Sequence, residues 1–170
     1  MTTRQHLDKL GERVPSGREP QTLYQTDFYA WTQQQAARLR DEDFADLDLN
    51  NLIEEIESMG ASEQRELENR LVVLLRHLLK LSGLPDSQPA RGWRLTVKEQ
   101  RQQLRRHLKR NPSLRPLVAD AVAELYADAL DLATDDLAND DLADANLPVR
   151  CPWTAEQVLD VDWLPQETTS

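Results

Sequence analysis

The sequence predicts an all-α protein: a bundle of about four main helices with a short helix near the C-terminus. Apolar residues recur at i, i+3, i+4 and i+7, the spacing of one helical face, as in Leu49, Leu52, Ile53, Ile56 and Met59. Only five Gly occur in 170 residues, and no long stretch alternates Val, Ile or Thr at the period of a strand. Packing between helices therefore has to supply the core.

The first two helices follow a polar arm. Thr26 is expected to cap a helix that runs through about Asp41, with Asp27 in its first turn. After a short turn at residues 44–46, a second helix runs to about Met59. Gly60 is ambiguous: we expect a break or kink there, because Ser62 can restart capping. The alternative is one long helix through residue 81, in which Gly60 costs about 1 kcal/mol against Ala.

The remaining helices are marked by leucine stripes and caps. The pattern predicts a third segment over about 62–81, a loop at 82–89, a fourth helix over about 92–110 and a fifth from near 113, where Pro116 fits only the first turn. Thr154 and Gln157 form a capping box for a last short helix. The residues predicted to be largely buried are Trp31, Leu52, Ile56, Leu71, Leu74, Leu78, Trp93, Leu104, Leu125 and Trp163.

Length and composition limit the domain organisation that the chain can have. The chain fits a flexible arm at 1–20, one all-α domain at 21–165 and a tail at 166–170. The lone Cys151 excludes an intramolecular disulfide and suits a reducing compartment. No apolar run approaches the ~20 residues of a membrane span. We therefore expect a cytoplasmic protein without a membrane partner.

The charges are segregated. Residues 91–115 hold nine basic side chains and one acid, whereas residues 120–144 hold nine acids and no base. A basic helix can follow nucleic acid phosphates. The favoured alternative is that the two segments are antiparallel neighbours whose charges face each other. With a formal charge of −10 and few aromatic stacking platforms, a nucleic acid partner is not expected.

Arg70 and His77 are the candidates for catalysis. They lie seven residues apart, two turns along one helix, a spacing similar to that of the active-site pair in HEPN-type ribonucleases. His can transfer protons near neutral pH, and Arg can hold a phosphate. The spacing is common by chance, however, and a packed histidine beside the leucine face is the favoured interpretation of His77, as of His107.

No cofactor or metal site is predicted. Glu54 and Glu57 flank one helix face, but helical di-metal sites typically add Glu-x-x-His pairs, which this chain lacks. Cys151 has no nearby Cys or His to complete a zinc site or a catalytic dyad. The chain also lacks a Gly-rich phosphate loop and a nucleophile elbow. For each of these candidate residues, a structural role is favoured over a catalytic or metal-binding role.

Several strings in order resemble a bacterial family known only as domain of unknown function 29. They are Leu23-Tyr24, Asp27-Phe-Tyr-Ala-Trp31, Asn51-Leu-Ile-Glu-Glu-Ile-Glu-Ser-Met-Gly60, Leu74-Leu-Arg-His-Leu-Leu-Lys80, Trp93-Arg-Leu-Thr-Val-Lys-Glu-Gln-Arg101, Asn111-Pro-Ser-Leu114, Cys151-Pro-Trp-Thr154, Gln157-Val-Leu-Asp160 and Trp163-Leu-Pro165. Residues 82–92 and the acidic 135–144 depart from the family pattern. The resemblance implies an all-α fold in a bacterial cytosol and brings no activity or catalytic residues.

The predicted function is a non-enzymatic protein-interaction or regulatory module. It would act on a protein partner, and a homo-oligomer is possible. The alternative is a HEPN-like ribonuclease or toxin–antitoxin component that uses Arg70 and His77. An enzyme should place both residues in one open cleft, whereas a binding module should expose an apolar patch rimmed by charge.

Overall fold

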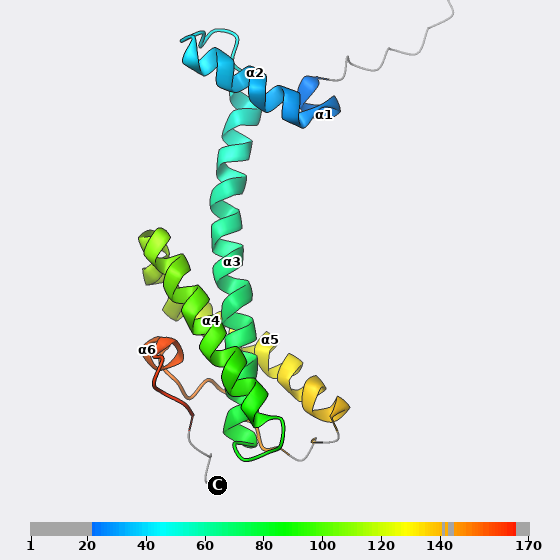
Figure 1. The fold of residues 1–170 in the computed structure, drawn as a ribbon, viewed down its shortest axis with the longest axis vertical. Coiled ribbons are helices and arrows are strands. Elements are labelled where there is room, and N and C mark those ends of the chain that lie inside the picture. The colour runs from blue at the N-terminus through cyan, green and yellow to red at the C-terminus, as the bar shows by residue number, and fades with distance from the viewer. Residues whose placement is uncertain (1–21, 141, 143–144, 166–170) are drawn as a thin grey trace, which may run out of the picture. The chain divides into compact units, whose positions relative to one another are not determined.

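The protein is described here by a computed structural model that covers residues 22–140, 142 and 145–165. Every regular element in those residues is helical, so the all-α prediction is confirmed (Figure 1). The elements are α1 (Leu23–Thr26), α2 (Phe28–Arg40), α3 (Leu49–Gly83), α4 (Ala90–Arg110), the 3₁₀ helix η1 (Pro112–Leu117), α5 (Val118–Asn139) and α6 (Ala155–Leu159). None of these helices is both long enough and apolar enough to cross a membrane.

The chain divides into two compact units, one ending at Glu55 and the other beginning at Ile56. The predicted arm at 1–20 and tail at 166–170 lie outside the described residues. The single all-α domain over 21–165 stays a prediction.

The expected break at Gly60 is wrong, because α3 is one helix from Leu49 to Gly83. Gly60 has no positive φ, and a Cβ built on it would meet nothing within 4 Å. Ser62 is therefore an interior residue of the helix. The backbone hydrogen bonds of a helix continue through a glycine when its neighbours are good helix formers, at the cost in stability stated above.

The first unit, described over 22–55, is organised by aromatic contacts and a shared carboxylate. Trp31 is buried, stacks on Phe28 at 5.5 Å between ring centroids and meets Tyr24 edge-on at 4.8 Å. Its Nε1 donates to Asp48 Oδ2 at 3.1 Å, and Gln35 Oε1 accepts from the Asp48 backbone N–H at 2.9 Å. These bonds tie α2 to the start of α3.

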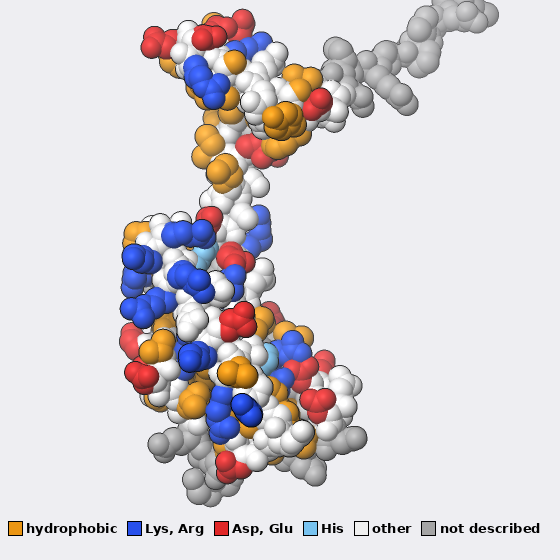
Figure 2. Space-filling view, in the orientation of Figure 1, with side chains coloured by type: hydrophobic (Ala, Val, Ile, Leu, Met, Phe, Trp, Pro, Cys, Tyr) orange, Lys and Arg blue, Asp and Glu red, His pale blue; other side chains and the backbone are white. Residues whose placement is uncertain are grey.

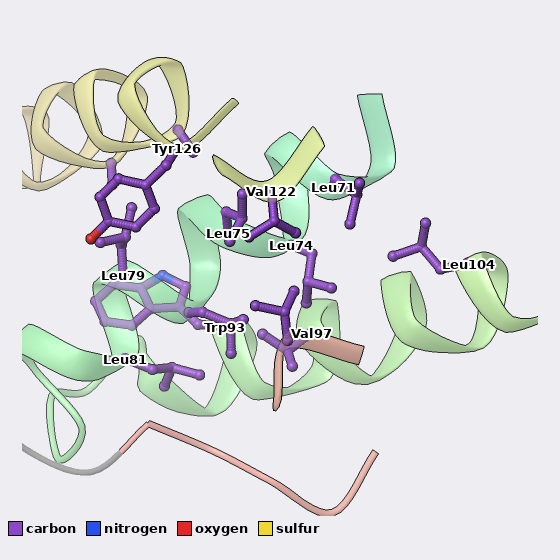
Figure 3. Packing of buried hydrophobic residues seen from close by; sticks show 14 of the residues in the cluster. Leu71, Leu74, Leu75, Leu79, Leu81, Trp93, Val97, Leu104, Val122 and Tyr126 are labelled. Carbon is purple, nitrogen blue, oxygen red and sulfur yellow. The ribbon is translucent and has the colours of Figure 1, made fainter. Parts of the chain in front are cut away.

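The second unit, described over 56–165, holds the main core. The leucine-rich half of α3 packs against α4 and α5, and Figure 3 shows Leu74, Trp93 and Val122 converging from those three helices. Val158 of α6 is fully buried in the same cluster. The buried apolar residues of this unit are Leu67, Leu71, Leu74, Leu75, Leu78, Leu79, Leu81, Ala90, Trp93, Val97, Leu104, Leu108, Val118, Val122, Tyr126, Ala129, Ala133, Leu137 and Val158.

Six of the ten predicted core residues are buried, namely Trp31, Leu71, Leu74, Leu78, Trp93 and Leu104. Leu52, Leu125 and Trp163 are only partly buried. Ile56 is wrong: its side chain is 66% exposed, and Met59 on the same face is 69% exposed. The helical face was identified correctly from its spacing, but spacing alone does not show whether another element covers it.

Helix starts also differ in detail from the expectations. Asp27, not Thr26, caps α2, and its side chain accepts from the Ala30 N–H at 2.9 Å. Pro116 lies inside η1, so α5 begins only at Val118. The capping box at Thr154 is present as predicted, with Gln157 N–H donating to Thr154 Oγ1 at 3.3 Å.

Truncating Leu74 to Ala should cost about 2–5 kcal/mol of unfolding free energy, because a fully buried leucine leaves an unfilled cavity. The matched control is Ile56→Ala on the exposed face of the same helix, expected to change stability by less than about 0.5 kcal/mol. Urea titrations of both variants measure the difference. Equal losses would show that the two faces have been assigned wrongly.

Gly60→Ala should stabilise the protein by about 1 kcal/mol, because the position is helical, open and entropically costly for glycine. Gly83→Ala is the control: its Cβ would lie 2.9 Å from Leu147 Cδ2 and 3.2 Å from Ala145 Cβ, so it should destabilise. Chemical unfolding compares the two. A loss of stability in Gly60→Ala would argue for the break.

Candidate functional site

Arg70 lies on the second half of α3, where Glu66 and Gln100 hold its guanidinium. Its Nε donates to Glu66 Oε1 at 2.6 Å, and one terminal nitrogen reaches Gln100 Oε1 at 3.4 Å. Arg70 and Glu66 line a groove of about 510 Å³ between α3 and α4. The other cations of this groove come from α4, at Arg106, Lys109 and Arg110.

His77 does not line the groove that Arg70 lines. Its ring is half-buried, and Nδ1 donates to the Val73 carbonyl at 2.8 Å. Burial lowers the pKa of His77, and the nearby Lys80 and Arg76 lower it further. The imidazole is therefore neutral at pH 7 and is held by its own helix. The two candidate residues share a helix without sharing this groove.

His107 takes part in joining α4 to α3. It is buried, and its Nε2 donates to the Glu63 carbonyl at 2.9 Å, while Nδ1 lies 3.5 Å from the Glu63 carboxylate. Asn111 donates to the same carboxylate at 2.7 Å. These contacts fasten the C-terminal end of α4, which is a structural role for His107.

The acidic and thiol candidates are Glu54, Glu57 and Cys151. Glu54 and Glu57 are both exposed on α3. In the part of the chain that the structure describes, no three His, Cys, Asp or Glu side chains gather as metal ligands would. Burial raises the pKa of the Cys151 thiol, whose Sγ donates to the Trp153 carbonyl at 3.5 Å. A raised pKa disfavours the reactive thiolate.

A partly buried ion-pair cluster joins α3 to α5, and the sequence analysis missed it. Lys80 is only 5% exposed, and its Nζ lies 2.6 Å from Asp136 Oδ2. Arg76 donates to both oxygens of the same carboxylate. Burial raises the pKa of Asp136, but the hydrogen bonds from Arg76 and Lys80 outweigh it and bring the pKa to about 2. The signal was a lysine in a run of buried leucines, Leu78 to Leu81.

Arg101 is a second missed residue, and it holds the C-terminal segment. Its guanidinium donates to the carbonyls of Val158 at 2.8 Å, Trp163 at 2.6 Å and Gln157 at 3.2 Å. The side chain is 2% exposed, and burial lowers its pKa. Its signal is periodicity, because position 101 fills the gap in the apolar stripe formed by Trp93, Val97, Leu104 and Leu108.

The expected pairing of the basic and acidic segments is wrong for the residues that the structure describes. Among those residues, no ion pair joins α4 to α5; the acid of α5 that is paired, Asp136, binds α3. Basic side chains instead gather on the surface over α4 (Figure 2). A second groove of about 540 Å³, between α4 and residues 161–164, is lined by Arg94, Lys98 and Arg105.

The first unit exposes most of its large apolar side chains. Phe44 is 61% exposed, and Leu49 and Ile53, one turn apart on α3, are 56% and 53% exposed. Leu23, Phe28, Tyr29 and Leu39 are exposed as well. Residues 41–55 add seven acids and no base. The first unit therefore presents apolar side chains in an acidic setting.

The comparisons with known proteins agree with the family resemblance. The family model described as domain of unknown function DUF29 matches residues 23–164. The chain belongs to this family. A search of curated proteins finds no match. A crystal structure of an α-helical protein of unknown function from Rhodospirillum rubrum is similar, with a TM-score of 0.57 and 27% identity, over 85% of this chain and 93% of that one.

Asp136→Asn should cost about 2–3 kcal/mol at pH 7, because it leaves Lys80 as a buried cation without its counter-charge. The folded-state pKa of Asp136 is below its ordinary 3.8, so its stabilisation is present above about pH 4 and is lost as the pH falls toward 2. Urea unfolding between pH 7 and pH 2 measures both effects. Asp135→Asn, exposed and unpaired, is the control and should change stability by less than about 0.5 kcal/mol.

His77→Gln should lose about 0.5–1.5 kcal/mol of stability, because the substitution disturbs one hydrogen bond in a half-buried position. No activity on RNA is expected from either protein. The measurements are thermal unfolding and a cleavage assay on labelled RNA. Cleavage by the wild type, lost by about 10²-fold or more in a well-folded variant, would establish the enzyme instead.

Proposed function

We propose that this protein is a non-enzymatic binding module that docks a protein partner on the first unit, residues 22–55. The observation that carries the proposal is the exposure of its apolar side chains. Seven large apolar residues of this unit are exposed, whereas Trp31 is the one that is buried. Scattered exposed apolar residues are normal, but this imbalance is typical of a surface completed by a partner.

The contacts inside the unit support the same conclusion. The unit has no cysteine, and its internal order rests on the aromatic contacts of Trp31 and on the hydrogen bonds of Trp31 and Gln35 to Asp48. These polar ties hold α2 on α3 while leaving Leu49 and Ile53 uncovered. A partner surface would supply the missing apolar contacts.

The charge of the first unit indicates which charge the surface of its partner should carry. Seven acids and no base occur at 41–55, and Glu54 is exposed beside Ile53. Complementary charge at the rim of an interface steers association and rejects wrong partners. The partner should therefore offer an apolar surface, such as one face of an amphipathic helix, bordered by Lys or Arg.

The test is photo-crosslinking in the native cells with a crosslinkable residue at Ile53, and with one at Val149 as control. Val149 is 83% exposed but lies in the second unit. Position 53 should capture a defined protein that position 149 does not. The purified partner should then lose at least about tenfold in affinity for a Leu49→Asp/Ile53→Asp variant that keeps its helical content. Equal capture at both positions, or equal affinity of the variant, would contradict the proposal.

A further inference from the structure

One face of α4 carries a basic stripe, which we define as Arg91, Arg94, Lys98, Arg105 and Lys109. The positions are spaced by three, four, seven and four residues, so their side chains fall within an arc of about 60°. All five are exposed. Arg94 donates to the Pro85 carbonyl at 2.7 Å, and the other four have no partner among the residues that the structure describes.

The solvent face of α5 carries an acidic stripe, which we define as Asp120, Glu124, Asp128, Asp131 and Asp135. The spacing of four, four, three and four residues keeps these carboxylates on one side of the helix. All five are exposed, and none forms an ion pair within the described ranges. The neighbouring Asp136 points the other way, to Lys80 and Arg76 on α3.

The two stripes match in length and differ in sign. At 1.5 Å per residue, the basic stripe extends about 27 Å and the acidic stripe about 22 Å. Within one chain they form no ion pair with each other. Each stripe is therefore an uncompensated row of charge that a second copy of the chain can neutralise.

We propose that the basic stripe of α4 binds the acidic stripe of α5 in a second copy of this chain. In a two-fold dimer the same contact occurs twice, because each copy offers both stripes. A nucleic acid on α4 would neutralise the basic stripe alone and would leave the acidic stripe repelling it. The groove that Arg94, Lys98 and Arg105 line on its α4 side, opposite Asp162, gives the carboxylates of the second copy a place to meet these three cations.

The dimer should be weak and sensitive to salt, since exposed ion pairs contribute little individually and act mainly through steering. Sedimentation velocity of the full chain should show dimers at about 0.02 M salt and monomers at about 0.5 M, where the Debye length falls from roughly 20 to 4 Å. A monomer at low salt and high protein concentration would overturn the proposal.

Charge reversal gives the decisive test. Lys98→Glu/Arg105→Glu and Glu124→Lys/Asp131→Lys should each weaken self-association by at least about tenfold, because each places like charges together. An equimolar mixture of the two variants should associate again, because both contacts of the mixed dimer then pair opposite charges. Failure of the mixture to associate, with both variants folded by circular dichroism, would overturn the proposal.

Matched control variants separate the effect of the two stripes from the effect of net charge. Arg65→Glu/Arg150→Glu and Glu57→Lys/Asp86→Lys change the formal charge by the same amounts at exposed positions off both stripes. Both control variants should dimerise like the wild type. The Leu49→Asp/Ile53→Asp variant should dimerise as well. A failure of the dimer proposal can therefore be distinguished from a failure of the proposed partner site. Salt-sensitive binding of a duplex oligonucleotide by a monomeric wild type, lost in Lys98→Glu/Arg105→Glu, would assign α4 to nucleic acid instead.

Discussion

The packing of the leucine face of α3, from Leu67 to Leu81, is the contact on which the second unit depends. α4, α5 and α6 each bury apolar side chains against this one cluster. The polar groups that enter the same region are anchored: Lys80 by Asp136, and Arg101 by three backbone carbonyls. Buried charge is tolerated there because each cation has its hydrogen-bond partners, and this restricts how the helices can pack.

The two halves of α3 show that helical periodicity predicts which residues share a face but not whether another element buries that face. Leu74 and Ile56 obey the same spacing, yet Leu74 is fully buried and Ile56 is two-thirds exposed. The difference comes from elements distant in sequence, which cover the residues after about 66 and leave the preceding turns in solvent. Helix identity, the Thr154 capping box and the leucine core were thus predictable from local pattern. Coverage of a face was not.

The arrangement of the charged residues was also predicted only in part. The segregation of bases at 91–115 from acids at 120–144 was visible in the sequence, but the direction of each charged row was not. Packing decided it, because Trp93 and Val97 on α4, and Val122 and Tyr126 on α5, turn inward and leave most charged residues outward. Asp136 and Arg101 lie in phase with those buried stripes, so both side chains contact other parts of the chain and not solvent alone.

The hydrogen bonds from Arg101 to residues 157–163 affect how the chain can fold while it is being synthesised. Its guanidinium sits on the inner face of α4, yet its acceptors are carbonyls some sixty residues later, at Gln157, Val158 and Trp163. Until those residues have left the ribosome, a nascent chain that closes α4 onto α3 must bury this cation without acceptors, which is unfavourable. Residues 157–163 therefore supply the acceptors that allow Arg101 to be buried on the inner face of α4. A product that stops before residue 157 lacks all three acceptors, so burial of Arg101 in it is unfavourable.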